Sequence, residues 1–399
     1  MDEPRFSIDQ DWLVRIRREL HAHPEIGWEL ENTVRVVRRE LDAIGIPYEV
    51  DRYGRNTIVA TVNPEITSFT LGIRADMDAL PIQEKNFDKP YRSRIDGAMH
   101  ACGHDAHTAM LLGACRTLYG MREKLRCRVK LLFQPCEESR PSGARTMCEH
   151  GVMDDIDAII MCHVNCNDPA HRPSCRAGTT NASSSRFQIT VRGRGVHVAS
   201  PHRGIDALAI GVRIYDGIQQ ILAREVDPFD TCVIAVTTMN AGTTVSANAD
   251  TCTMTGSIRC LKTATMDWAR ARLTRLTENL CRDLRGEYEI DFFGEPLPPA
   301  VNDAHMYAAF AETCRRMGGD GFLLPLEPSP GAEDFAYYEQ KKPGLLFGLG
   351  MRNDEKGFNK PAHTCDWDID EAALSTGVTL FTRFVWDHMD GVPGLSPKP

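Results

Sequence analysis

The fold is decided around residues 99–138, which read MHACGHDAHTAMLLGACRTLYGMREKLRCRVKLLFQPCEE. A loop rich in histidine comes first, and from about Thr108 to Leu118 apolar residues recur with helical spacing. The apolar run Val129–Phe133 then predicts a buried strand that ends shortly before two glutamates. A helix followed by a buried strand is a building unit of α/β layer structures.

The same alternation continues on both sides of this stretch. Helical spacing extends over residues 12–20 and 34–44, and apolar runs at Thr57–Val62, Leu71–Ala75 and Ala158–Val164 predict further buried strands. Strands that alternate with helices predict an α/β domain with a mixed, mostly parallel sheet.

The middle of the chain has a different pattern. Its predicted elements follow the order β-α-β-β-α-β, which is typical of ferredoxin-like folds. They are strands at Phe187–Arg192, Val233–Thr238, Cys252–Cys260 and Tyr288–Phe293, with helices at Ile205–Leu222 and around Leu273–Leu280. We therefore predict one α/β domain, residues 1–183 and 296–399, interrupted by an inserted ferredoxin-like α+β domain, residues 184–295.

Composition excludes several classes of protein. Of the 399 residues 42% are hydrophobic and 25% charged, which is ordinary for a globular protein. The net charge of -9 argues against a nucleic-acid partner. No apolar run approaches the roughly 18 residues of a membrane helix, and the first ten residues, MDEPRFSIDQ, lack the layout of a signal peptide. We expect a cytoplasmic protein without membrane contact, whose 14 cysteines are mostly reduced thiols.

Metal-capable side chains gather at four places, mostly at predicted strand ends, where open α/β sheets carry their sites. The densest place is the loop 99–108, in which Cys102 and His104 can approach one ion. Glu137 and Glu138 follow a strand, His163 ends another, and His363 lies in a polar loop. Each place alone has a simpler interpretation: a histidine-rich helix cap, solvent-facing carboxylates, a core histidine or a loop histidine.

Together the four places supply a ligand set suited to borderline transition metals. One ion would leave ligands unused, whereas two ions that share the Cys102 thiolate would use all of them. Glu137 then remains as a carboxylate base, as in two-metal hydrolytic sites.

Longer motifs match a known family in order over nearly the whole chain. They are RRELHAHPEIGWELENT (17–33), IRADMDALPIQE (73–84), MHACGHDAHTAMLLGA (99–114), LLFQPCEES (131–139), HV (163–164), VRGRGVHVASPHRGIDAL (191–208), MTGSIR (254–259), GAEDFAYY (331–338) and PAH (361–363). The sequence resembles metallopeptidase family twenty, subfamily D, the aminoacylase/carboxypeptidase type, which contains hippurate hydrolase and the indoleacetyl-amino-acid hydrolases.

The resemblance implies a site with two divalent ions per subunit, Mn or Zn first and Co or Ni as alternatives. It names Cys102, His104, Glu138, His163 and His363 as the ligands and Glu137 as the general base. It also implies that the inserted domain is a lid that forms a homodimer.

Further roles are implied for residues outside the ligand set. Asp76 and Asp78 would orient ligands, unless they only cap a strand. His197 would donate to the substrate carbonyl from the partner subunit, and Arg259 would pair with a substrate carboxylate, unless both are ordinary surface residues.

Two positions depart from the family pattern. Val196 replaces the usual glycine before the lid histidine. The asparagine that contacts the substrate in the family falls on Ser246, with Asn248 two places further along the chain.

The expected function is a metal-dependent amidohydrolase that cleaves an N-acyl amino acid or related small amide with a metal-bridged water and Glu137 as base. One alternative is a deaminase or an aryl-amine/aryl-amide hydrolase that uses the same site. The other, from a different class, is an inactive dimeric binding homologue.

Overall fold

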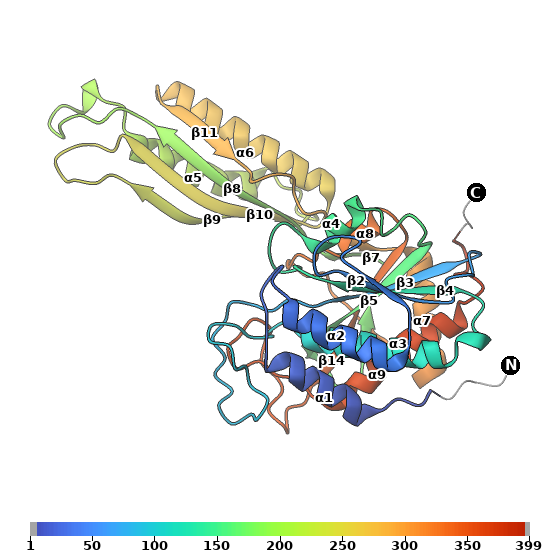
Figure 1. The fold of residues 1–399 in the computed structure, drawn as a ribbon. Coiled ribbons are helices and arrows are strands. Elements are labelled where there is room, and N and C mark those ends of the chain that lie inside the picture. Colours follow the sequence, from blue (N-terminus) through green and yellow to red (C-terminus); the bar gives the residue numbers. More distant parts are fainter. Residues whose placement is uncertain (1–5, 396–399) are drawn as a thin grey trace. The chain divides into compact units, whose positions relative to one another are not determined.

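The computed structural model describes residues 6–395, and these divide into two compact units (Figure 1). Unit 1 holds the chain up to Thr180, Val301–Glu327 and the chain from Asp334 onward, and unit 2 holds Asn181–Ala300 and Pro328–Glu333. The predicted insertion, residues 184–295, lies inside unit 2. The short segment Pro328–Glu333 carries no strand or helix signal that could assign it to this unit from sequence.

Unit 1 is built on an eight-stranded mixed sheet with the order β1-β2-β4-β3-β5-β14-β6-β13. The strands are β1 (Tyr48–Val50), β2 (Ile58–Val62), β3 (Thr70–Asp76), β4 (Arg128–Gln134), β5 (Ala158–Pro169), β6 (Pro173–Cys175), β13 (Leu324–Pro325) and β14 (Gly344–Arg352). The central strands β4, β3, β5 and β14 are parallel to one another, whereas β2 and β6 pair antiparallel with them. The predicted mixed, mostly parallel sheet is thus confirmed.

Helices cover both faces of this sheet because its strands are apolar on both sides. In β2, Ile58 and Ala60 belong to one buried core and Val59 to another, since successive side chains alternate. The first core packs under α1 (Gln10–His21), α2 (Glu31–Ile44), α3 (His104–Gly120), α7 (Ala304–Gly318) and α9 (Leu374–Asp387). The second packs under α4 (Gly143–Glu149) and α8 (Ala336–Glu339).

Two elements differ from the sequence prediction where the site lies. Helix α3 begins at His104 rather than near Thr108, because Gly103 takes the left-handed conformation, φ 91°, directly before it. Strand β5 continues to Pro169, so His163 lies within the strand and not at its end. Pairing of β5 with β3 stops at Met161 while its pairing with β14 goes on, which leaves His163 beyond the end of the neighbouring strand.

Unit 2 has the strand and helix order β-α-β-β-α-β. Its sheet has the order β11-β8-β10-β9, with every neighbouring pair antiparallel. The elements are β8 (Ser183–Arg192), α5 (Ala207–Arg224), β9 (Cys232–Ala241), β10 (Thr251–Cys260), α6 (Thr263–Asp283) and β11 (Glu287–Asp291). Both helices share one buried core with this sheet. Separately, β7 (Gly178–Asn181) and β12 (Ala300–Asn302) form a two-stranded sheet.

Among residues 6–395 no helix combines the length and the apolar character that crossing a bilayer requires.

Candidate metal centre

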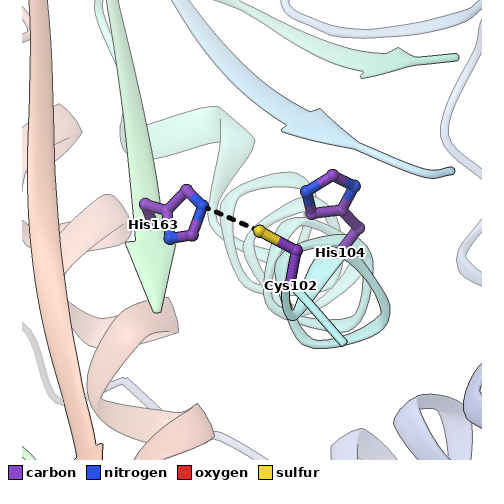
Figure 2. A group of neighbouring side chains, drawn as sticks. All are labelled: Cys102, His104 and His163. Carbon is purple, nitrogen blue, oxygen red and sulfur yellow. Dashed lines mark hydrogen bonds between the residues drawn. The ribbon is translucent and has the colours of Figure 1, made fainter. Parts of the chain in front are cut away.

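Five of the predicted ligands lie together in unit 1 as two trios that share one residue. The first trio is Cys102, His104 and His163, and the second is Cys102, Glu138 and His363. Cys102 Sγ lies 3.5 Å from His163 Nε2 (Figure 2). It also lies 3.3 Å from His363 Nε2, which is itself 3.3 Å from Glu138 Oε1. Ligands about 2.0–2.3 Å from a tetrahedral ion lie roughly 3.5 Å from each other. The spacing therefore suits two ions with Cys102 between them.

Gly103 sets the approach of Cys102 and His104. Its left-handed backbone turns the chain from an extended loop into the first turn of α3. A Cβ at this position would come 2.2 Å from Val164 Cγ2, so only glycine fits. Cys102 therefore stays in the loop while His104 is the first residue of the helix.

His163 is held in one tautomer. Its Nδ1 donates a hydrogen bond of 2.8 Å to the Val164 carbonyl, which leaves Nε2 without a proton in the neutral ring. That nitrogen points toward Cys102 Sγ (Figure 2). A backbone acceptor on the far nitrogen is the usual way to orient a ligating imidazole.

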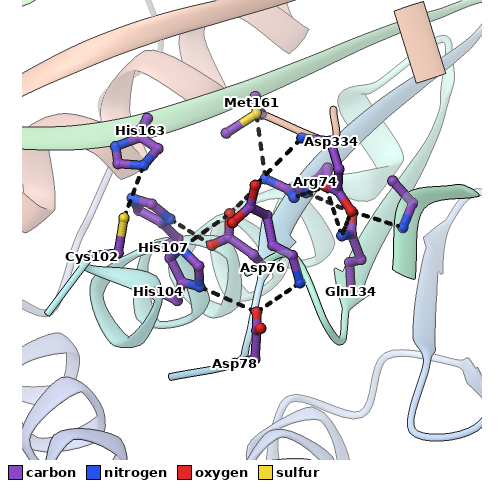
Figure 3. Close-up of polar contacts among 12 residues, drawn as sticks. Arg74, Asp76, Asp78, Cys102, His104, His107, Gln134, Met161, His163 and Asp334 are labelled. Atoms are coloured by element: carbon purple, nitrogen blue, oxygen red, sulfur yellow. Dashed lines mark hydrogen bonds and ion pairs between the residues drawn. The ribbon is translucent and has the colours of Figure 1, made fainter. Parts of the chain in front are cut away.

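His107, three residues into α3, is engaged on both sides of its ring. Its Nδ1 donates to Asp76 Oδ1 at 2.6 Å (Figure 3), and its Nε2 accepts the Val164 amide at 2.9 Å. Both nitrogens are therefore used by the protein, and His107 serves to join Asp76 at the end of β3 to β5. Burial lowers the pKa of His107 to about 4, against the charge of Asp76, so that the ring is neutral.

Asp78 joins the two carboxylate residues to His104. Its two oxygens accept the backbone amides of Glu137 and Glu138 at 3.0 and 3.1 Å. One of them also lies 3.4 Å from His104 Nδ1, while Asp76 Oδ2 lies 3.8 Å from His104 Nε2. The predicted orienting positions of Asp76 and Asp78 thus face a candidate ligand, as Figure 3 shows.

Glu137 lies at the edge of the cluster and is half-buried. Its Oε1 accepts the Asp334 backbone amide at 3.4 Å, a long contact. Its carboxylate also lies within ligand distance of His104 and Glu138. Glu137 is therefore held near the two trios, although it belongs to neither.

Neighbouring groups shift the pKa of each member of the second trio. Burial would raise the pKa of Cys102, but the neighbouring imidazoles of His163 and His104 outweigh it and lower that pKa to about 6. The hydrogen bond to Cys102 and the nearby carboxylate of Glu138 raise the pKa of His363 to about 10. Burial opposes ionisation of Glu138, yet the nearby imidazoles of His363 and His104 lower its pKa.

Unsatisfied polar atoms test whether a metal fits. Within the described residues, both ring nitrogens of His104 and Oε1 of Glu138 are buried without a hydrogen-bond partner. Buried polar groups are nearly always bonded, so unbonded atoms at the point where the two trios meet are free to bind an ion. A thiolate, imidazoles and a carboxylate converge there, and these donors fit a divalent transition metal.

His100, which the sequence grouped with this loop, stands apart from the two trios. It is fully buried, and neither ring nitrogen has a hydrogen-bond partner among the described residues. Burial lowers its pKa to about 3, so the ring is neutral.

Sequence reasoning missed the buried arginine Arg74, which lies behind the site. It donates to Asp76 Oδ2 at 2.6 Å, to Asp334 Oδ1 at 2.8 Å and to Gln134 Oε1 at 2.9 Å (Figure 3). It therefore connects the partner of His107 to the residue whose amide contacts Glu137. A charged residue inside the apolar run Leu71–Ala75 was the signal, because a buried charge needs a partner.

Arg17 of α1 was missed as well. Its fully buried guanidinium meets Asp105 Oδ2 at 2.8 Å, Asp368 Oδ1 at 2.9 Å and Glu371 Oε1 at 3.3 Å. Asp105 follows the candidate ligand His104, and the other two carboxylates follow His363 in the chain. Arg17 thus ties together the two segments that carry candidate ligands from opposite ends of the sequence.

Four predicted site residues lie in unit 2. His197 is exposed, and its Nδ1 accepts the Ala199 amide at 3.1 Å, so the neutral ring carries its proton on Nε2. His197 pairs with Ala247 across an antiparallel bridge, and the neighbouring Ser246 is also exposed. Arg259 lies on β10 and donates to Ser184 Oγ.

Asn248 is used within its own unit. Its side-chain oxygen accepts the Val196 amide at 2.9 Å, and its nitrogen donates to the Arg194 carbonyl at 3.3 Å. These bonds hold the segment just before His197.

Comparison with known proteins places this geometry among metallohydrolases. Residues 72–387 match the model of peptidase family M20/M25/M40. The chain is 34% identical to IAA-amino acid hydrolase ILR1-like 2 of Arabidopsis thaliana, over 95% of this chain and 85% of that protein. It is 32% identical to N-acetylcysteine deacetylase of Bacillus subtilis, over 93% and 95% of the two chains. A solved structure, the YXEP protein of Bacillus subtilis described as a dinuclear metal binding peptidase, superposes with a TM-score of 0.81, 30% identity and coverage of 94% and 97%.

Proposed function

The chain belongs to peptidase family M20/M25/M40, and we propose that it cleaves the amide bond of an N-acyl amino acid with Glu137 as general base. Members of the family are hydrolases of the metal-dependent peptidase and amidohydrolase type, and this chain is one of them. The observation that carries the proposal is the pair of ligand trios that share Cys102, with Glu137 beside both Glu138 and His104.

We propose that Cys102, His104 and His163 hold one divalent ion and that Cys102, Glu138 and His363 hold the other. Manganese or zinc suits this mixture of donors best, with cobalt or nickel as alternatives. Bound there, the ions supply Lewis acidity, which lowers the pKa of water and polarises a carbonyl oxygen. Unbonded nitrogens on His104 and the low pKa of Cys102 support the assignment.

Glu137 serves as the proton carrier in this proposal. Its carboxylate takes the proton of the attacking water and returns it to the nitrogen of the leaving amine. Two backbone contacts keep the group in place, since the Asp78 carboxylate accepts its amide and the Asp334 amide donates to its Oε1.

Residues of unit 2 provide substrate contacts in the proposal. His197 presents the protonated Nε2 that a donor to a carbonyl oxygen needs. Arg259, near the end of β10, pairs with the substrate carboxylate. Ser246 precedes the start of that strand, beside the bridge between His197 and Ala247, so in the proposal it contacts the substrate together with His197 from the partner subunit. We assign Asn248 a different role from the expected substrate contact: it positions the loop of His197, because both ends of its amide bind backbone there.

The proposed substrate class is N-acyl amino acids. Two relatives support it, because their names, IAA-amino acid hydrolase and N-acetylcysteine deacetylase, refer to amino acids that carry an acyl group on nitrogen. A panel of N-acyl amino acids, their carboxamides and aryl amides, compared by kcat/KM, tests the class. Preference for free carboxylates supports it. Preference for aryl amides, or release of ammonia, would favour the aryl-amide hydrolase or deaminase instead.

The test of the mechanism is Glu137→Gln. This variant alters neither ligand trio, so two ions per chain should remain, while kcat falls about 100- to 10,000-fold because the proton carrier is lost. Metal content and turnover are measured on the same sample. Glu149→Gln, on the exposed side of α4, is the matched control and should change neither. Normal turnover in metal-replete Glu137→Gln protein would remove Glu137 from the mechanism.

A further inference from the structure

Unit 2 contains two cysteines that face each other across neighbouring strands. Cys232 is the first residue of β9 and Cys260 the last residue of β10. The strands run antiparallel, and these two residues are direct partners in their register. The Cys260 thiol donates to Cys232 Sγ, with the sulfur atoms 3.7 Å apart.

The backbone at this pair has the spacing of a disulfide. Directly opposed residues of antiparallel strands have Cα atoms about 4.5–5.5 Å apart, inside the roughly 4.4–6.8 Å that disulfides span. Their side chains lie on the same face of the sheet. A bond of about 2.05 Å then needs only a change of side-chain rotamers. We propose that Cys232 and Cys260 form a reversible disulfide when the protein meets a low-molecular-weight disulfide.

Exposure assigns different roles to the two sulfurs. β9 is an edge strand of the four-stranded sheet, and Cys232 is partly exposed there, whereas Cys260 is buried. The oxidant therefore reaches Cys232 first. The hydrogen bond from Cys260 lowers the pKa of Cys232, although burial and Asp230 oppose this, and a lower pKa raises the fraction of thiolate.

Other cysteines of the same core lack this arrangement. Cys281 is buried in α6, and burial raises the pKa of its thiol to about 11. Cys252 is also buried, and burial raises its pKa. These two thiols are therefore natural controls within one folded unit.

The exchange conserves atoms and electrons. The Cys232 thiolate attacks one sulfur of glutathione disulfide and expels one glutathione thiolate, which leaves a mixed disulfide on Cys232. Cys260 then loses its proton, and its sulfur attacks Cys232 Sγ and expels the second glutathione. Two protein thiols are oxidised, and one glutathione disulfide is reduced to two glutathione molecules. Excess reduced glutathione or dithiothreitol drives both steps backward.

The consequence is a covalent link between the start of β9 and the end of β10. Arg259 precedes Cys260, and its side chain points to the opposite face of the strand. The bond therefore forms behind the residue proposed to bind a carboxylate, without replacing it. The inference does not depend on the proposed reaction, because it rests on the two strands alone.

The test equilibrates the purified full-length protein in glutathione buffers of increasing oxidised fraction, followed by acid quenching and peptide mapping without reduction. We expect one intramolecular link, between Cys232 and Cys260, that dithiothreitol reverses and that raises the thermal midpoint. Cys281→Ser should keep the link, and Cys232→Ser should abolish it.

Cys260→Ser gives a second readout that needs no link. Without the resolving sulfur, Cys232 should retain a glutathionyl group, detected as a mass adduct on its peptide. Wild-type protein that stays fully reduced at Cys232 and Cys260 in the most oxidising buffer would overturn the proposal. Links or adducts confined to other cysteines would overturn it equally.

Discussion

At the scale of single residues, Asp78 shows how few groups organise the centre. One carboxylate accepts the amides of Glu137 and Glu138 and lies beside His104. One side chain thus positions the proposed base, Glu137, and one proposed ligand from each trio, Glu138 and His104. Such a group is recognisable only from its contacts, because an aspartate after a strand more often caps it.

Both trios contain Cys102, so its replacement should disrupt both proposed ion sites. Cys102→Ala should lower bound metal below two ions per chain and abolish turnover, because no other described residue offers an anion common to both trios. Metal analysis of the reconstituted protein measures this directly. Cys115→Ala, buried in α3, is the control and should keep both ions. Two ions bound with wild-type affinity by Cys102→Ala would reduce the cysteine to a packing role.

At the scale of elements, the start of α3 determines the geometry of two proposed ligands. We expect Gly103→Ala to destabilise the fold and to lower metal occupancy. The new Cβ would meet Val164 at 2.2 Å, and the backbone has φ 91°. Urea unfolding and metal analysis measure both effects.

Gly97→Ala isolates the backbone contribution to this prediction. Gly97 has φ 75°, but its new Cβ would meet nothing within 4 Å. Left-handed strain alone costs about 1–2 kcal/mol, and overpacking adds about 1–3 kcal/mol. Equal losses of unfolding free energy in the two variants would show that the contact with Val164 is relieved without cost.

The end of α9 carries a pH-dependent contribution to stability. Burial lowers the pKa of His388; Asp387 acts in the opposite sense, and Arg316 of α7 adds to the lowering. The ring also packs on Phe384. In the unfolded state His388 takes up a proton near pH 6.5, whereas in the folded state it does so only at lower pH. Its contribution to the free energy of unfolding is therefore fully present above pH 6.5 and is lost as the pH falls.

We therefore expect His388→Gln to flatten the decline of unfolding free energy between pH 7 and pH 5. Urea titrations of metal-free wild type and variant at several pH values measure the difference. The candidate metal ligands are the same in both proteins, so their own pH dependence cancels in the comparison. Identical slopes would mean that His388 keeps its ordinary pKa in the fold.

At the scale of the whole molecule, Arg17 joins parts of unit 1 that are far apart in sequence. It is fully buried against Asp105, Asp368 and Glu371. We expect Arg17→Met to lower the unfolding free energy by about 3–5 kcal/mol, because it leaves buried carboxylates without a counter-charge. Arg126→Met, which removes an exposed pair with Asp390, is the control and should change stability little. Comparable losses in both variants would contradict a special role for Arg17.

The sequence by itself determined the alternation of strands and helices in the first 164 residues, the order of elements in the insertion, the mixed sheet and the residue types of the candidate metal centre. These follow from short-range periodicity and from motifs that occupy consecutive positions. Cys102, His104, Glu137 and Glu138 were readable because each pair is nearly adjacent in the chain.

Only the tertiary structure decided which polar groups are ligand candidates and which are supports. His107 looks as capable as His104 in the sequence, yet Asp76 and the Val164 amide engage both of its nitrogens. The roles of Arg17 and Arg74 depend on carboxylates hundreds of positions away. Local propensity carries no information on such pairs, since a buried charge is stabilised by whichever partner the completed fold brings within hydrogen-bond distance.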